Sequence, residues 1–119
     1  MDLDFYERFK NSVEEIKTSG DKYALARADS YYRQEMSKVI LSRIQTSFGD
    51  IPVSKAEIKA RASEEYQKHL EETAEAIKLE HIAKNALEVA KAKFEGNRSL
   101  SSLEKATRSN TGGNYEHVS

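Results

Sequence analysis

The sequence predicts an all-α protein: an antiparallel helical hairpin or bundle with one long C-terminal helix, which we expect to be oligomeric. Apolar residues recur three or four positions apart over most of the chain, the period of one helix face. No segment shows the alternating pattern of a strand. Neither glycine nor proline occurs from Ser63 to Glu95. At about 1.5 Å per residue, that stretch would form a rod of roughly 50 Å.

A first helix is predicted from about Asp2 to Thr18. Its apolar residues are spaced for one core-facing stripe: Phe5, Phe9, Val13 and Ile16. The acidic residues at its start favour the positive end of the helix dipole. We expect Ser19-Gly20-Asp21 to break the chain after it, because glycine is a frequent helix terminator.

A second helix is predicted from about Asp21 to Ser47. Its core-facing stripe is expected to contain Leu25, Ala28, Tyr32, Met36, either Val39 or Ile40, and Ile44. Phe48 could fold back over the last turn before Gly49 ends the helix.

A short third helix is predicted from Ser54 to Ala62. Ser54-Lys55-Ala56-Glu57 matches the capping box, in which serine and glutamate each satisfy a free backbone N–H. Ser63 could cap a fresh helix, followed at once by two glutamates. The alternative is one unbroken helix from 54 to 95.

The long helix, predicted over 64–95, carries an alanine-rich seam. One face holds Tyr66, Leu70, Ala74, Ile77 and His81, and the seam continues through Leu79, Ile82, Ala83, Ala86, Leu87, Ala90 and Phe94. Alanine buries little area, so a core of this kind is often completed by another chain. We therefore expect an oligomer interface at Ile77, Ala83, Leu87, Ala90 and Phe94. The alternative is a monomer in which the first two helices cover the whole seam.

Residues 1–106 are predicted to form one helical domain and residues 107–119 a mobile polar tail. The chain has no cysteine, which excludes disulfides and thiolate chemistry and suits a reducing compartment. No apolar run approaches the roughly 20 residues needed to span a bilayer, and the N-terminus lacks a signal-peptide core. We expect a cytoplasmic protein with no membrane partner.

No catalytic signature is apparent. The three histidines, His69, His81 and His117, lack the spacing of a helical metal site. No nucleophile elbow and no glycine-rich phosphate loop occurs. The adjacent glutamates, such as Glu64-Glu65, are expected to be solvated helix faces. We expect no enzyme activity, no metal and no cofactor.

Charge is unevenly distributed. Residues 22–61 hold eight basic and four acidic side chains, a net charge of +4, whereas 63–95 hold five basic and eight acidic ones, a net charge of −3. The basic segment also carries Tyr23, Tyr31 and Tyr32. Arginine beside aromatic rings is the combination that holds phosphates and stacks bases of single-stranded nucleic acid. The alternative is a solvated helix face with Tyr32 in the core.

Several short motifs carry a family resemblance over about residues 21–105. They are Ala-Arg-Ala-Asp-Ser-Tyr-Tyr-Arg at 26–33, Ser-Lys-Ala-Glu at 54–57, Ala-Arg-Ala-Ser-Glu-Glu-Tyr at 60–66 and Phe-Glu-Gly-Asn-Arg-Ser at 94–99. The chain resembles small all-helical phage-encoded proteins, and in size and helix order it is similar to recombination mediators of the UvsY type. The resemblance implies an oligomeric protein that loads a recombinase onto single-stranded DNA coated with single-strand-binding protein.

Two functions remain open. The first is a phage-type recombination accessory protein in the host cytoplasm, with single-stranded DNA, a recombinase or a single-strand-binding protein as partners. Its DNA contacts are expected at Arg27, Tyr31, Lys38, Lys55 and Lys59, whereas Arg33 and Arg43 should be salt-bridged. The second is a helical adaptor that binds no DNA, such as an assembly chaperone or an inhibitor of a host protein. Under the first, arginines project together into a groove; under the second, they pair with glutamates on neighbouring helices.

Overall fold

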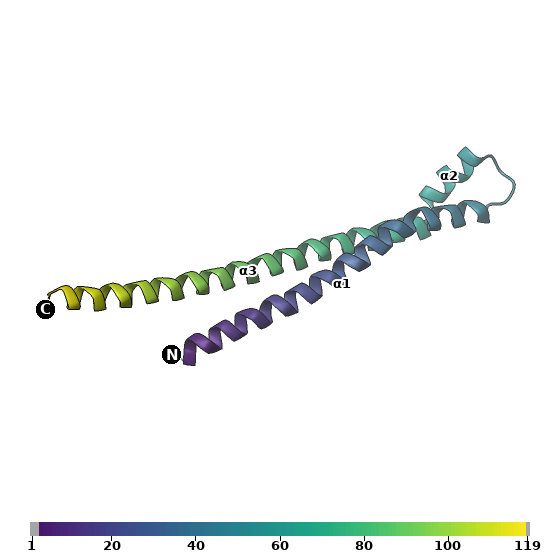
Figure 1. The fold of residues 1–119 in the computed structure, drawn as a ribbon. Helices are drawn as coiled ribbons and strands as arrows, with labels where there is room; N and C mark the ends of the chain where they lie inside the picture. Colours follow the sequence, from purple (N-terminus) through teal and green to yellow (C-terminus); the bar gives the residue numbers. More distant parts are fainter. Residues whose placement is uncertain (1–2, 119) are drawn as a thin grey trace. The chain divides into compact units, whose positions relative to one another are not determined.

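The computed structural model describes the backbone of residues 3–118 and the side chains of residues 3–107. This part contains three α-helices and no strand: α1 (Leu3–Ser47), α2 (Val53–Ala62) and α3 (Glu64–Val118) (Figure 1). Helices α1 and α3 pack against each other in opposite directions. The predicted all-α hairpin with a long C-terminal helix is therefore confirmed.

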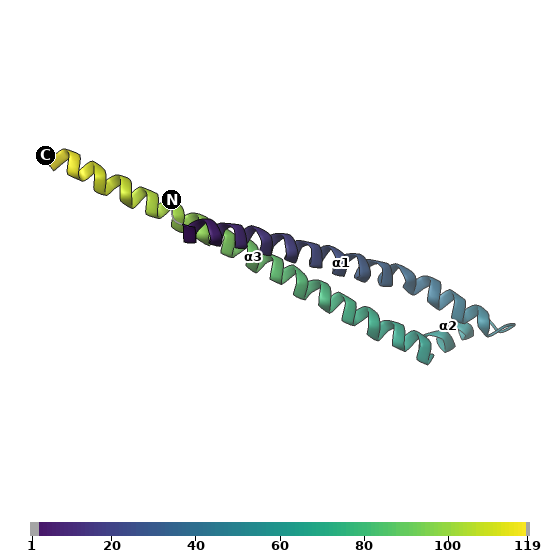
Figure 2. The same ribbon diagram turned by 90° about the horizontal axis from the view of Figure 1, so that it is seen from below.

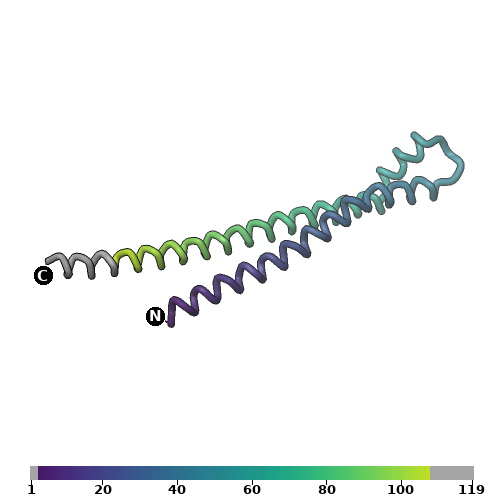
Figure 3. Tube along the Cα trace, in the orientation of Figure 1, coloured from purple at the N-terminus to yellow at the C-terminus, as the bar shows by residue number. Residues whose placement is uncertain are grey.

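The chain divides into two compact units. Unit 1 comprises Met1–Gly20 and Asn85–Ser119, and unit 2 comprises Asp21–Lys84. Unit 2 includes α2 and the turn that leads into it from α1, which the Cα trace shows as a tight loop (Figure 3). In this unit the C-terminal part of α1 lies beside the N-terminal part of α3 in both views (Figure 1, Figure 2).

The seam between the helices follows the three-four alternation of a coiled coil, with small and polar residues at many positions. In unit 2 the buried or half-buried seam positions on α1 are Tyr23, Ala26, Ser30, Arg33, Ser37, Ile40 and Ile44. Their counterparts on α3 are Tyr66, His69, Thr73, Ala76, Glu80 and Ala83. In unit 1 the seam contains Phe5, Ser12, Ile16 and Ser19 on α1, and Leu87, Ala90, Phe94, Asn97 and Ser101 on α3.

The predicted stripe of residues 21–47 is only partly inward: Met36 and Ile40 are half-buried as expected, whereas the other members before Ile44 face outward. Leu25, Tyr32 and Val39 are 74%, 62% and 55% exposed, and Ala28 is exposed too. Ile44 was placed correctly, since it is buried with Ala60 and Tyr66 against Ile40 and Leu41. Helix α3 packs against a face of α1 that contains serines. This face is rotated around α1 from the most apolar face of that helix.

The apolar stripes predicted for residues 2–18 and 64–95 are only partly buried between the helices. Phe5 and Ile16 are half-buried, whereas Phe9 and Val13 are 44% and 45% exposed. On α3, Tyr66 and Ala90 are buried as expected. The exposed members of the predicted α3 seam are Leu70, Ala74, Leu79, His81, Ile82 and Ala86.

The predicted break at Ser19-Gly20-Asp21 is also wrong, because α1 continues through it. Gly20 has no positive φ, and a methyl group added to it would lie 4.0 Å from the Leu87 side chain of the same unit. Packing against α3 stabilises α1 around Gly20. This stabilisation outweighs the roughly 1 kcal/mol by which a glycine inside a helix lowers its stability.

Helix α3 runs past the predicted end at Glu95. Gly96 lies inside it, and further along the same helix the Ser101 hydroxyl donates to the Asn97 carbonyl at 3.0 Å. The predicted polar tail begins at residue 107, and the side chains of 108–119 lie outside the described part, as do residues 1, 2 and 119. The division into a 1–106 domain and a mobile tail stays a prediction.

On either side of α2 the chain breaks where the sequence predicts, at Gly49 and Ser63, but the predicted capping box at the start of α2 is absent. Gly49 has φ +73, a left-handed conformation that suits glycine at a helix end. The capping box at Ser54 is not formed, because Pro52 is the N-cap residue and no side chain caps this end. Ser63 breaks the chain as one alternative expected: its Oγ donates to the Ala60 carbonyl at 2.6 Å and accepts from the Tyr66 N–H at 3.2 Å.

Candidate nucleic-acid interface

Three of the predicted DNA contacts lie on one side of α1 in unit 2. Arg27 and Tyr31 are one helical turn apart, and Lys38 lies two turns further along. All three are exposed, Tyr31 by 66%. No hydrogen bond or ion pair joins any of them to another described side chain. Their charges and the tyrosine ring therefore remain available to a ligand.

The other two predicted contacts, Lys55 and Lys59, lie on α2 and are exposed. The Lys59 Nζ atom lies 6.0 Å from the centroid of the Phe48 ring, at the outer limit of a cation–π contact. Phe48 thus sits beside α2 at the end of α1. All five predicted contacts belong to unit 2.

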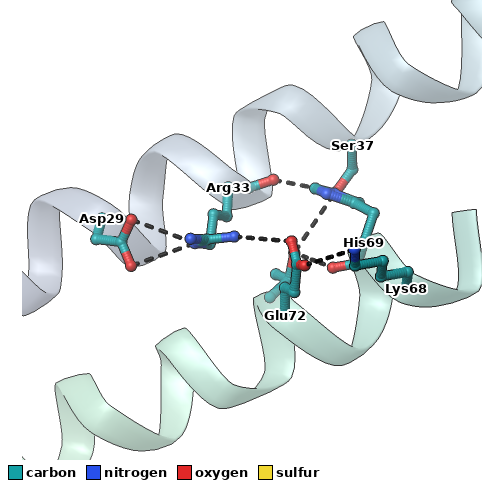
Figure 4. A network of polar contacts seen from close by, with 7 residues as sticks. Asp29, Arg33, Ser37, Lys68, His69 and Glu72 are labelled. Carbon is teal, nitrogen blue, oxygen red and sulfur yellow. Dashed lines mark hydrogen bonds and ion pairs between the residues drawn. The ribbon is translucent and has the colours of Figure 1, made fainter. Parts of the chain in front are cut away.

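The remaining arginines of this segment are held by acidic partners. Arg33 lies 3.2 Å from both Asp29 and Glu72, so it links α1 to α3 (Figure 4). Arg43 forms an ion pair with Glu65 on α3. The prediction that Arg33 and Arg43 are salt-bridged is therefore confirmed, although it named no partners. Such half-exposed pairs contribute about 0–1 kcal/mol each, so they fix orientation more than stability.

Arg61 is paired as well, with Glu57 of the same helix at 3.0 Å. The eight basic residues of this segment therefore form two groups: the three paired arginines, and five cations that have no ion pair with another described side chain, namely Lys22, Arg27, Lys38, Lys55 and Lys59. The paired group does not project into a common basic groove. A hollow of about 180 Å³ beside Arg33 is lined by three carboxylates, those of Asp29, Glu72 and Glu75. Phosphate would be repelled there.

Tyr32 was expected in the core, and this expectation is wrong. Its side chain is 62% exposed, nearly as much as the neighbouring Tyr31. The cause is the rotated seam, in which Ser30 and Arg33 occupy the inward positions on either side of it.

A buried polar cluster around His69 was not predicted. The His69 Nε2 atom lies 2.8 Å from the Ser37 Oγ (Figure 4). The Thr73 hydroxyl donates to the His69 carbonyl at 2.7 Å. His69 is only 7% exposed. The sequence feature that could have indicated this cluster is Ser37, a serine on the face of α1 that packs against α3. Hydropathy alone does not assign a serine to a buried face. Within the described side chains, no group of three or more histidines, cysteines and carboxylates could hold a metal ion.

Unit 1 contains a second unpredicted polar contact. The Asn97 Nδ2 donates to the Ser12 Oγ at 2.9 Å, and Lys93 pairs with Glu15 at 3.3 Å. An open hollow of about 470 Å³ lies alongside them, lined also by Arg8. Its rim mixes both signs of charge and has no clustered catalytic groups.

The predicted oligomer-interface residues lie on or near the α1-facing side of α3. Ala90 is 1% exposed, and the Phe94 ring lies 5.6 Å from that of Phe9 in the same chain. Ile77, Ala83 and Leu87 are half-buried. Contacts with α1 account for part of this burial, and their role between chains stays a prediction.

None of the helices, as far as the structure describes them, is apolar enough over a sufficient length to cross a membrane. Comparisons of the chain with known protein families, with curated proteins and with solved structures find no match.

Proposed function

We propose that this protein is a DNA-recombination accessory protein of the mediator type, which binds single-stranded DNA weakly through unit 2. The observation that carries the proposal is the group of exposed residues Arg27, Tyr31 and Lys38, which have no partner among the described side chains. A cation on each side of an exposed aromatic ring is suited to a strand whose phosphates and bases alternate.

The proposal extends to Lys55 and Lys59 on α2, which add positive charge to the same unit. The protein partner is a recombinase or a single-strand-binding protein, and the protein is not an enzyme. A phage origin and action in the host cytoplasm follow from the family resemblance given above. A cytoplasmic partner also suits a chain without cysteine.

Replacing Tyr31 by alanine tests the stacking part of the proposal. Stacking is worth about 1–3 kcal/mol per base, so affinity for a labelled oligonucleotide should fall roughly five- to over a hundredfold. Tyr6→Ala is the matched control, because Tyr6 is 55% exposed in unit 1, outside the proposed surface. Fluorescence anisotropy measures both, and an equal loss in the two variants would contradict the proposed stacking.

Replacing Arg27 or Lys38 tests the charge part. Each lost phosphate contact should flatten the slope of log affinity against log salt by about 0.7. Lys17→Ala, an exposed lysine of unit 1, should leave the slope unchanged. If the wild-type protein shows no binding at low salt and high protein concentration, this surface is a solvated face.

A helical adaptor that binds no DNA is the second candidate. It is favoured by the pairing of Arg33 and Arg43 with glutamates of α3, because such pairing uses arginines for structure rather than for phosphate. Glu35, exposed and one turn from Tyr31, would also oppose a phosphate. The same anisotropy titration separates the two candidates.

A further inference from the structure

The most apolar face of α1 in unit 2 is left in contact with water. We call it the outer stripe, and it consists of Leu25, Ala28, Tyr32, Met36 and Val39. Leu25, Tyr32 and Val39 are 74%, 62% and 55% exposed, Ala28 is also exposed, and Met36 is half-buried. The seam positions of the same helix segment are Ala26, Ser30, Arg33 and Ser37, and none of them is a large apolar residue. A helix normally buries its apolar face, so exposure of this one indicates an interaction surface.

The outer stripe has a symmetric spacing. Its residues are three, four, four and three positions apart, with Tyr32 at the centre. A two-fold axis through Tyr32, with a second α1 running antiparallel, maps the stripe onto itself. Leu25 then faces Val39 of the second copy, and the small Ala28 faces the larger Met36. Such self-complementarity is what a two-fold interface between identical chains requires.

The charges at the two ends select the same arrangement. Asp21 lies four residues before Leu25, and Arg43 lies four residues after Val39. The antiparallel arrangement places the Asp21 carboxylate opposite the Arg43 guanidinium of the second copy, twice in each dimer. A parallel arrangement would place like charges together, which is unfavourable.

The neighbouring charges are compatible with this pairing. Arg43 contacts Glu65 through one guanidinium nitrogen, and a guanidinium has five N–H donors, so further donors remain. The exposed Glu35 would face Asp29 of the second copy, a like charge, but Asp29 is already paired with Arg33 at 3.2 Å.

We infer that the outer stripe is the interface of an antiparallel homodimer, with a second copy of this chain as its occupant. The stripe covers 15 residues of helix, about 21 Å. Contact along one helix face of this length buries less area than the roughly 800 Å² per partner of a standard interface. The dimer should therefore form in a concentration-dependent way. The inference is independent of DNA binding, and it involves a different surface from the predicted interface at Ile77–Phe94.

Sedimentation of the full chain across concentrations tests the inference. The wild type should shift from monomer to dimer as its concentration rises to about 1 mM, because an interface this small is expected to be weak. Tyr32→Glu should weaken the dimer at least tenfold, because it places a carboxylate on the two-fold axis beside its own copy. Ile58→Glu, at a 70%-exposed position on α2, should leave the dissociation constant within twofold of the wild-type value. Circular dichroism should show that both variants remain helical.

Single cysteines test the direction of the helices, since the chain has none of its own. A disulfide needs Cα atoms within about 7 Å. Tyr32→Cys should therefore crosslink to itself under mild oxidation, whereas Ala24→Cys, on the flank of α1, should not. Leu25→Cys and Val39→Cys should crosslink only when the two variants are mixed.

Three results would overturn the inference. The first is a wild-type chain that stays monomeric over the whole concentration range. The second is an assembly that Tyr32→Glu does not weaken. The third is self-crosslinking of Leu25→Cys without crosslinking in the mixture, which would indicate parallel helices.

Discussion

Serine hydroxyls occupy inward positions of unit 2 where aliphatic side chains would be expected. Ser30 is fully buried and accepts a hydrogen bond from the Gln34 amide at 2.9 Å. Ser37 contacts His69 across the seam at 2.8 Å. No buried side-chain nitrogen or oxygen in the described part lacks a hydrogen-bond partner. These contacts matter because a buried polar atom left unpaired costs about 1–3 kcal/mol.

Replacing Ser37 by alanine should lower the free energy of unfolding by about 1–2 kcal/mol, because the buried His69 loses its partner on α1. Ser42→Ala is the matched control: it makes the same change in helix propensity at an exposed position of the same helix. Urea denaturation followed by circular dichroism compares the two. Equal unfolding midpoints would show that the contact with His69 contributes nothing.

Among the helix breaks, sequence reasoning succeeded where backbone geometry demands a particular residue. Gly49 has a positive φ, which few side chains tolerate, and Ser63 supplies a hydroxyl to two helix ends. It failed at Gly20, which lies inside α1, and at Gly96, which lies inside α3 just beyond the predicted end of that helix at Glu95. A glycine lowers helix stability by only about 1 kcal/mol, and the packing that offsets this loss comes from residues distant in sequence.

The two kinds of glycine should respond in opposite ways to alanine. Gly20→Ala should raise the free energy of unfolding by about 0.5–1 kcal/mol, because the new methyl group meets the Leu87 side chain at an ordinary 4.0 Å. Gly49→Ala should lower it by about 1 kcal/mol or more, because φ is +73 there. Thermal denaturation measures both. A loss of stability in Gly20→Ala would mean that α1 does not pass through residue 20 as a regular helix.

The period of the helices could be predicted from the sequence, but not the face that each would bury. On residues 21–47 the apolar residues gather on one face, and hydropathy selects Leu25, Tyr32 and Val39. Helix α3 packs instead on the face of Ser30 and Ser37, where small side chains permit close approach and polar ones find partners. The pairing of Arg33 and Arg43 could be predicted because their positions lie away from the proposed contact side. The partners Glu72 and Glu65 could not, since they depend on helix register.

The two units differ in the composition of their seams. Unit 2 has a buried cluster of Ile44, Ala60 and Tyr66, to which α2 contributes. In unit 1 the fully buried positions are Ser12 and Ala90, and the aromatic contact of Phe9 with Phe94 is half-exposed. Local stability follows the buried apolar area, so unit 1 should open more readily than unit 2.

Hydrogen exchange should therefore be slower in the seam of residues 21–84 than in that of residues 3–20 and 85–107. Phe94→Ala should reduce protection in unit 1 by about 1–3 kcal/mol of opening free energy, since a half-buried ring is lost. Tyr6→Ala, an exposed aromatic of the same unit, is the control. An equal loss of protection across residues 21–84 would show that the chain opens as one cooperative body.

The serine and alanine seam also determines how the protein should respond to temperature. The heat-capacity change of unfolding grows with newly exposed apolar surface and is reduced by exposed polar surface, and globular proteins average about 12–15 cal/mol/K per residue. A chain that keeps Leu25, Tyr32 and Val39 in water and buries hydroxyls instead exposes little new apolar surface on unfolding. Its monomer should therefore have a small heat-capacity change and a broad, shallow stability curve. Association through the outer stripe would restore part of that curvature, so calorimetry at rising concentration would detect the dimer as an increase in heat capacity of unfolding.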